Sequence, residues 1–186
     1  MNQKNFGYSV FKKAWEKSGG LIKTTIEYGK TPENAKLLYS WISPRTLTDI
    51  VNDINTMSNN TMARTVFLNL SANKNTKGDL EVSRLIVDNW LQRKGFYFKN
   101  LLIDNGSGLS RKVKISPYDM TSFLLHSIIS DDAYLWINTL AKAGYNGTAK
   151  NRFKKMEVRG KAWVKTGSLE GVQACSGYVK TKSKRW

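Results

Sequence analysis

The sequence is poor in several residue types that often stabilise small folds or build active sites. It contains one cysteine and one histidine among 186 residues, so no intrachain disulfide and no cysteine-based metal cluster can form. No apolar run approaches the roughly 18 residues that a membrane-spanning helix needs. The first residues, 1–6, also lack the apolar core of a secretory signal peptide. We therefore expect neither a metal nor a cofactor, and no transmembrane segment.

Acidic residues are scarce as well. The chain has 14 Asp and Glu against 30 Lys and Arg, which gives a formal net charge of +16. So large a charge favours an anionic partner, such as nucleic acid, anionic lipid or an acidic cell-wall polymer. The lysines are spread along the chain, however, which is typical of a solvated surface. A basic nucleic-acid-binding protein is therefore kept only as a remote alternative.

The single histidine and the single cysteine lie in segments with regular patterns. His126 falls within an expected helix of mixed character, where an ordinary helix residue is the plain interpretation. Cys175 lies between Ala174 and Ser176 in an expected strand, which favours a small packed residue over a nucleophile. With His126 as the sole histidine, the sequence contains no metal-ligand cluster.

Most of the chain shows the apolar spacing of helices with a few intervening strands. Helices are predicted over 4–18, 43–54, 62–70, 80–93, 118–129, 131–140 and 148–155. Ser43 and Ser116, each followed by proline, are the expected N-caps of two of them. Strands are predicted over 21–28, 37–42 and 96–103, with a C-terminal hairpin around 162–165 and 172–179. The alternation predicts an α+β (mixed α/β) fold.

The hairpin carries the first chemical signal, Lys165-Thr166-Gly167, followed by Ser168-Leu169-Glu170-Gly171-Val172. This tripeptide puts an ammonium group, a hydroxyl and an unobstructed backbone on one strand, a combination that suits a substrate with a terminal carboxylate. The tripeptide alone arises easily by chance in a lysine-rich chain. It becomes informative because it begins the longer string 165–172 and because two polar stretches lie upstream of it.

Those stretches interrupt the helical pattern at residues 57–60 and 104–111. The first includes Ser58 and Asn60 between two helices, where side chains can enter a cleft. The plain alternative is a helix cap, since Ser and Asn are preferred N-caps. The second stretch has two glycines flanking Ser107, which permits backbone turns that other residues resist.

Taken together, the three stretches resemble the low-molecular-mass class C penicillin-binding proteins, which are D-alanyl-D-alanine carboxypeptidases and endopeptidases. That family has Ser-x-Asn between two helices, an (Asp/Asn)-Gly-Ser-Gly-Leu-Ser-Arg loop, and Lys-Thr-Gly-(Ser/Thr)-Leu-x-Gly-Val before a Gly-Tyr-Val strand. The matching positions here are Ser58 and Asn60, 105–111, 165–172 and 177–179, and 143–148 is similar to the family's Ala-Gly-Tyr-Asp-Gly-(Ser/Thr) turn. The resemblance implies a serine β-lactamase/penicillin-binding-protein transpeptidase-like fold, an antiparallel sheet flanked by helices.

Residue by residue, the resemblance implies a catalytic set of Ser58, Asn60 and Lys165. Ser58 would relay a proton to the leaving D-alanine, and Asn60 would hold the substrate amide. Lys165 and Thr166 would bind the terminal carboxylate. The substrate-binding set is completed by Gly167, by Ser107, and by Ser168, whose backbone N–H would supply half of an oxyanion hole.

The resemblance also implies partners and a location. The substrate would be a peptidoglycan stem peptide ending in D-Ala-D-Ala, and β-lactams would acylate the full-length enzyme. Neither a metal nor a cofactor nor a nucleic acid takes part. Because the substrate lies outside the cytoplasmic membrane, the enzyme would be periplasmic or otherwise extracytoplasmic.

The family's nucleophile is the serine of a Ser-x-x-Lys motif at the start of a buried helix. The pattern occurs twice here, at Ser9–Lys12 and at Ser71–Lys74, but Ser9 falls mid-helix and Ser71 ends a helix. We therefore expect a partial domain over 1–186, truncated at both ends, that lacks the nucleophile and is inactive alone. The alternative is a non-catalytic peptidoglycan-binding module that retains the Lys165 cleft.

Overall fold

The computed structural model describes residues 3–23, 25–73, 76–183 and 186. The chain groups into two compact units, Met1–Ser43 and Pro44–Trp186, which are described separately below. The sequence-based expectation of one partial domain over 1–186 stays a prediction. Among the described residues, no helix has both the length and the apolar character required to cross a bilayer.

The first unit consists of helix α1, Gln3–Lys17, and an irregular segment. The helix confirms the prediction over 4–18, and Gly19 follows it with a φ of +90°. The predicted strands over 21–28 and 37–42 are wrong, because the described residues there form neither helix nor strand. Leu38 in this segment is 95% exposed. Alternation alone does not hold a strand whose backbone has no neighbouring strand to pair with.

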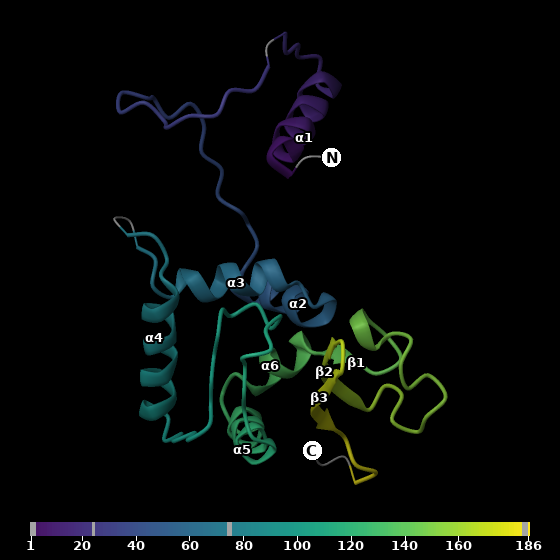
Figure 1. Ribbon diagram of the computed structural model, residues 1–186. Coiled ribbons are helices and arrows are strands. Elements are labelled where there is room, and N and C mark those ends of the chain that lie inside the picture. The colour runs from purple at the N-terminus through teal and green to yellow at the C-terminus, as the bar shows by residue number, and fades with distance from the viewer. Residues whose placement is uncertain (1–2, 24, 74–75, 184–185) are drawn as a thin grey trace. The chain divides into compact units, whose positions relative to one another are not determined.

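The second unit carries five α-helices among its described residues: α2 Leu47–Met57, α3 Asn60–Asn69, α4 Leu80–Arg93, α5 Pro117–Ile128 and α6 Ala133–Thr139 (Figure 1). Ser116 caps α5 as predicted, accepting a hydrogen bond from Asp119 N at 3.0 Å. The prediction that Ser43 caps α2 is wrong. Thr46 does so, because Asp49 three residues on completes a capping box with it.

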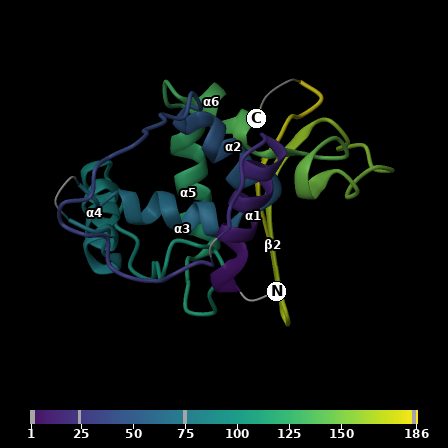
Figure 2. The ribbon, with the colours of Figure 1, turned by 90° about the horizontal axis from the view of Figure 1, so that it is seen from above.

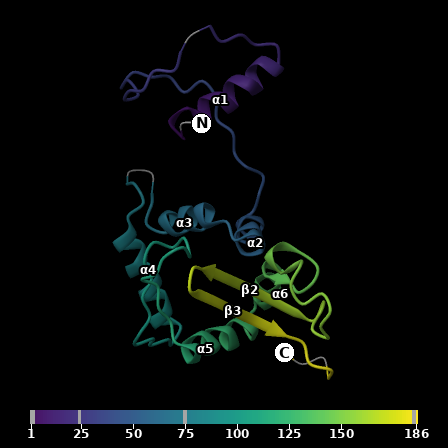
Figure 3. The same cartoon turned by 45° about the vertical axis from the view of Figure 1, so that its right-hand side comes forward.

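The sheet has three antiparallel strands in the order β1 (Ala141–Lys142), β2 (Ala162–Leu169) and β3 (Val172–Val179). Figure 3 shows β2 and β3 side by side. The predicted C-terminal hairpin is therefore confirmed. The strand predicted over 96–103 is wrong, since only an isolated bridge joins Leu102 to Lys114. The helix predicted over 148–155 is reduced to the 3-10 turn η1, Gly147–Ala149, followed by irregular turns.

The two faces of the sheet pack against different parts of the chain. Ala162 and Val164 of β2 lie in a buried cluster with Ala143 and Ala149 of the segment that follows β1. On the other face Tyr178 packs with α6, and its hydroxyl donates to Leu124 O of α5 at 2.9 Å. Figure 2 shows the sheet edge-on, with α2 to α6 on one side and the segment that follows β1 on the other. Alternation along β2 therefore places residue 165 on the helix side.

The single histidine lies on α5 and the single cysteine on β3. His126 is half-buried on α5 with its ring edge-on to Phe96 at 5.0 Å between centroids, as an ordinary helix residue would be. Cys175 is exposed, so the prediction of a small packed residue is wrong. It lies on β3, the outer strand of the described sheet, where the residues 172–175 are all exposed.

Candidate functional site

The connection between α2 and α3 consists of two residues, and its geometry directs side chains out of both helices. Ser58 ends α2 in the left-handed conformation, with φ of 54° and ψ of 48°, which is uncommon for a residue other than glycine. Asn59 caps α3 by accepting a hydrogen bond from Met62 N at 3.0 Å. The plain alternative of a helix cap therefore applies to Asn59. Ser58 and Asn60 are left to bond elsewhere.

The side chain of Lys165, on β2, contacts the side chain of Ser58. Its Nζ donates to Ser58 Oγ at 2.5 Å and to the carbonyl of Thr166 at 2.9 Å, which joins β2 to the end of α2. An apolar cavity of about 360 Å³ also borders Lys165 on the helix side of the sheet. Burial lowers the pKa of the Lys165 ammonium below its ordinary value, because desolvation disfavours the charged form. A lysine in this state exchanges a proton with a neighbouring hydroxyl more readily than an exposed lysine does.

Asn60 lies at the first turn of α3 and bonds to the glycine loop. Its Nδ2 donates to the backbone carbonyl of Ser107 at 2.7 Å. The hydroxyl of Ser107 is engaged within the loop, donating to Asn105 Oδ1 at 2.6 Å and accepting from Leu109 N at 3.0 Å. The loop therefore offers Asn60 a backbone carbonyl, and the Ser107 hydroxyl holds the turn together. The expected substrate contact of Ser107 stays a prediction.

The glycines of this loop allow it to approach both α3 and the hairpin. Gly106 has a φ of +71°, and a Cβ there would lie 2.3 Å from the Phe67 ring, so only glycine fits. At the other end of the loop, Arg111 Nη2 donates to the carbonyl of Glu170 in the β2–β3 turn at 2.9 Å. The loop 104–111 thus connects the start of α3 with the tip of the hairpin.

Thr166 is placed differently from Lys165. It is 7% exposed and belongs with Ala162 and Val164 to the buried positions of β2, on the face away from the helices. Its hydroxyl shares a hydrogen bond with the Thr148 hydroxyl at 3.1 Å. The structure therefore does not place the Thr166 hydroxyl beside the ammonium, and its contact with a substrate carboxylate stays a prediction. Thr148 was not assigned from the sequence, although it ends the recognised 143–148 turn.

The remaining predicted residues, Gly167 and Ser168, lie on an open part of β2. Ala143 N donates to Ala162 O at 2.9 Å, so the even-numbered residues of β2 direct their backbone groups toward β1. The β1 pairing ends at Val164, and Ser168 N–H therefore points to an edge without a strand partner among the described residues. A Cβ on Gly167 would meet only Ala174, at 3.8 Å, so its backbone is accessible.

Neither Ser-x-x-Lys match lies at the start of a helix, since Ser9 is within α1 and Ser71 follows the end of α3. Ser9 Oγ donates to Asn5 O within α1 at 2.9 Å, and α1 belongs to the first unit. Ser71 Oγ bonds to Ser83 Oγ at 2.8 Å after the end of α3, and its partner Lys74 lies outside the described residues. In the part of the chain that is described, no group of three His, Cys, Asp or Glu side chains could hold a metal ion.

Comparison with known proteins gives one consistent result. The sequence profile of the D-Ala-D-Ala carboxypeptidase 3 (S13) family matches residues 2–186. D-alanyl-D-alanine carboxypeptidase DacB of Haemophilus influenzae is 28% identical over 151 residues, which are 80% of this chain and 31% of that protein. A D-alanyl-D-alanine carboxypeptidase of an Actinomadura species is 27% identical over 178 residues, 91% of this chain and 33% of that protein.

The fold comparison agrees. The crystal structure of penicillin-binding protein 4 (dacB) from H. influenzae, complexed with a β-lactam, matches 99% of this chain with a TM-score of 0.78 and 25% identity, and 43% of that chain is covered. The predicted α+β fold of the penicillin-binding proteins is therefore confirmed for the part present. The chain spans about a third of the length of the curated relatives it matches, at 31% and 33%. With its profile, its relatives and its fold in agreement, the chain belongs to the D-Ala-D-Ala carboxypeptidase 3 (S13) family.

Proposed function

We propose that this chain forms the proton-relay and substrate-recognition part of a serine-type D-Ala-D-Ala carboxypeptidase or endopeptidase that hydrolyses peptidoglycan stem peptides. The observation that carries the proposal is the contact between Lys165 Nζ and Ser58 Oγ at 2.5 Å, which joins the first and last recognised motifs. Asn60, two residues from Ser58, supports it through its bond to the Ser107 carbonyl. The substrate peptide and β-lactams are proposed ligands of the whole protein.

The proposed chemistry follows from these groups. In the whole enzyme a serine attacks the carbonyl of the penultimate D-alanine, and the bond to the terminal D-alanine breaks. The leaving amine needs a proton. The Ser58 hydroxyl would donate this proton, and the Lys165 ammonium would then donate one to Ser58. The Ser168 N–H, on the open edge of β2, would stabilise the negative charge on the carbonyl oxygen. Lys165 and Thr166 would bind the terminal carboxylate, and Asn60 the substrate amide.

The chain by itself is proposed to be inactive. Neither Ser-x-x-Lys serine begins a helix, because Ser9 bonds to Asn5 O within α1 and Ser71 bonds to Asp79 and Ser83 at the start of α4. Incubating the purified 186-residue chain with a fluorescent penicillin should therefore leave it unlabelled. Stoichiometric covalent labelling would show that a nucleophile is present and overturn this part of the proposal.

A binding measurement tests the recognition part. An acyl-D-Ala-D-Ala peptide should bind the chain in isothermal titration calorimetry, and the corresponding L-Ala-L-Ala peptide should not. Lys165→Ala should abolish the binding, because it removes the ammonium group that faces Ser58. Lys154→Ala, which changes an exposed lysine, is the matched control. Equal binding of both peptides, or no effect of Lys165→Ala, would contradict the proposal.

The second candidate function is a non-catalytic peptidoglycan-binding module. It is favoured by the contacts among the recognised groups, together with the position of Ser9 within α1 and that of Ser71 after the end of α3. Sequencing the coding DNA upstream of Met1 separates the two candidates. An in-frame helix-initial Ser-x-x-Lys and a signal peptide would support the enzyme and an extracytoplasmic location, whereas their absence would support the binding module.

A further inference from the structure

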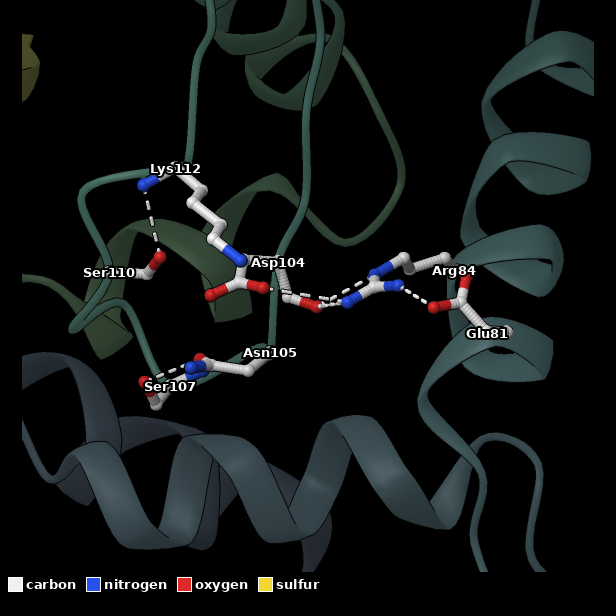
Figure 4. Close-up of polar contacts among 7 residues, drawn as sticks. All are labelled: Glu81, Arg84, Asp104, Asn105, Ser107, Ser110 and Lys112. Atoms are coloured by element: carbon white, nitrogen blue, oxygen red, sulfur yellow. Dashed lines mark hydrogen bonds and ion pairs between the residues drawn. The ribbon is translucent and has the colours of Figure 1, made fainter.

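One arginine outside the recognised motifs bonds to the start of the glycine loop. Arg84 lies in the first half of α4, with its side chain 25% exposed. Its Nε donates to the carbonyl of Asp104 at 2.7 Å, and its Nη2 donates to the same oxygen. Nη2 also lies 3.5 Å from Asp104 Oδ1, and Nη1 pairs with Glu81. Figure 4 shows Arg84 reaching from α4 to Asp104, with Asn105 and Ser107 further along the loop.

The helix that carries Arg84 is itself well fixed. Ser83, its neighbour, is fully buried, and its hydroxyl bonds to that of Ser71 at 2.8 Å. Asp79 caps the helix by accepting a hydrogen bond from Val82 N at 2.9 Å. Because Arg84 extends from a fixed helix and donates two hydrogen bonds to the Asp104 carbonyl, that carbonyl has little freedom to rotate.

From Asp104 the constraint continues along the loop to Asn60. Asn105, the next residue, accepts hydrogen bonds through Oδ1 from Ser107 N at 3.0 Å and from Ser107 Oγ at 2.6 Å. The Ser107 carbonyl in turn accepts from Asn60 Nδ2 at 2.7 Å. An asparagine amide can flip by exchanging its oxygen and nitrogen, and an acceptor in a fixed place decides which way it points. With Nδ2 held by Ser107, Oδ1 is the atom left to accept a substrate N–H.

We propose that Arg84 is a positioning residue, which fixes the orientation of the Asn60 amide through Asp104, Asn105 and the Ser107 carbonyl. The part of this inference that concerns substrate rests on the function proposed above. The part that concerns the amide itself does not, and it can be measured without any ligand.

The primary test is NMR on the ¹⁵N-labelled chain, with the Asn60 side-chain NH₂ signals assigned by their loss in Asn60→Asp. Arg84→Ala should shift or broaden these signals and the backbone signals of Gly106 and Gly108. Signals of β2 and β3 should stay in place. Arg93→Ala, an exposed arginine near the end of the same helix, is the matched control and should change none of them. Unchanged Asn60 signals in a folded Arg84→Ala chain would overturn the proposal.

A conservative variant keeps the proposal testable if Arg84→Ala does not fold. Arg84→Lys retains the charge but cannot donate two hydrogen bonds from a planar group to one carbonyl. It should therefore move the Asn60 signals in the same direction as Arg84→Ala, by a smaller amount. Asn60 signals identical to wild type in Arg84→Lys would count against a role for the guanidinium geometry.

Peptide binding provides the second measurement and separates the two proposals. If the acyl-D-Ala-D-Ala peptide binds the wild-type chain, Arg84→Ala should weaken its affinity about tenfold, the effect of losing one hydrogen bond. Failure of the peptide to bind the wild-type chain would count against the proposed function alone. Wild-type affinity in Arg84→Ala despite disturbed Asn60 signals would overturn the claimed role of Arg84 in substrate binding.

Discussion

Burial lowers the pKa of the Lys165 ammonium, so the fold shifts this lysine toward its neutral form. In the unfolded chain its pKa returns to the ordinary value of 10.5. Between the lowered value and 10.5, the unfolded state binds more protons than the folded state. The free energy of unfolding should therefore rise with pH across this window. Below the window, the ammonium is charged in both states, and the full loss of stability from burying that charge should be present.

Replacing Lys165 with methionine should remove that contribution. We expect the unfolding free energy of the wild type to increase relative to that of Lys165→Met as pH rises toward 10. The gain should stay below the roughly 1.4 kcal/mol per pH unit that one full proton difference gives. Urea denaturation at a series of pH values measures the difference, with Lys154→Met as the exposed control. Parallel pH curves for wild type and Lys165→Met would refute the expectation.

The paired hydroxyls of Thr148 and Thr166 give a second prediction. Thr166 is 7% exposed and bonds to Thr148 at 3.1 Å, so Thr148→Val leaves a buried hydroxyl without its partner. We expect a loss of about 1–2 kcal/mol in unfolding free energy. The double variant Thr148→Val/Thr166→Val should recover part of it, because no unpaired hydroxyl then remains. Strictly additive losses in this double-mutant cycle would mean that the hydroxyls do not interact.

At the scale of elements, the loop 104–111 depends on the absence of a side chain at Gly106. An added Cβ would meet the Phe67 ring at 2.3 Å, and φ is already +71°. Gly106→Ala should therefore cost about 2–4 kcal/mol, the sum of overpacking and left-handed strain. Gly171→Ala isolates the strain, since Gly171 has a φ of +72° with nothing within 4 Å. Equal losses in the two variants, measured by urea denaturation, would show that contact with Phe67 does not matter.

The elements also show what sequence patterns can predict. Helices such as α4 were found because their apolar spacing and their caps are encoded within a few neighbouring residues. The strand predicted over 96–103 failed because a strand exists only where a second strand pairs with it, and only Leu102 finds a partner, Lys114. The β2–β3 hairpin was predictable because its two strands follow each other directly.

The residues of the candidate site show the same difference between local patterns and tertiary contacts. Ser58, Asn60 and Lys165 could be proposed from the sequence because their motifs fix residue types at short spacing, and their roles stay predictions. Arg84 was not proposed from the sequence, because an ordinary arginine on a helix shows its contact with Asp104, twenty residues on, only in the folded structure. Thr148 was missed because nothing in the sequence pairs its hydroxyl with that of Thr166. Contacts of this kind depend on tertiary packing, which periodicity and motifs do not report.

At the scale of the whole chain, the two compact units differ in how well their backbone is protected from proteases. Residues 25–43 form neither helix nor strand, and they include Lys30 and Lys36, both exposed. The irregular segment around Lys154 and Lys155 in the second unit is better held, because Phe153 and Val158 pack against the buried cluster of β2. Proteases cut first where the backbone is exposed and lacks tertiary packing.

Limited trypsin digestion should therefore cut first after Lys30 and Lys36, and later after Lys154 and Lys155. Gel electrophoresis and mass spectrometry would identify a product that begins near residue 37 and continues through the second unit. Because Ser58, Asn60 and Lys165 all belong to that unit, the purified product should bind the acyl-D-Ala-D-Ala peptide with the affinity of the intact chain. Loss of binding in an otherwise folded product would show that residues 1–36 contribute to the site. First cuts within the second unit would show that its packing protects it less than the contacts of Phe153 and Val158 indicate.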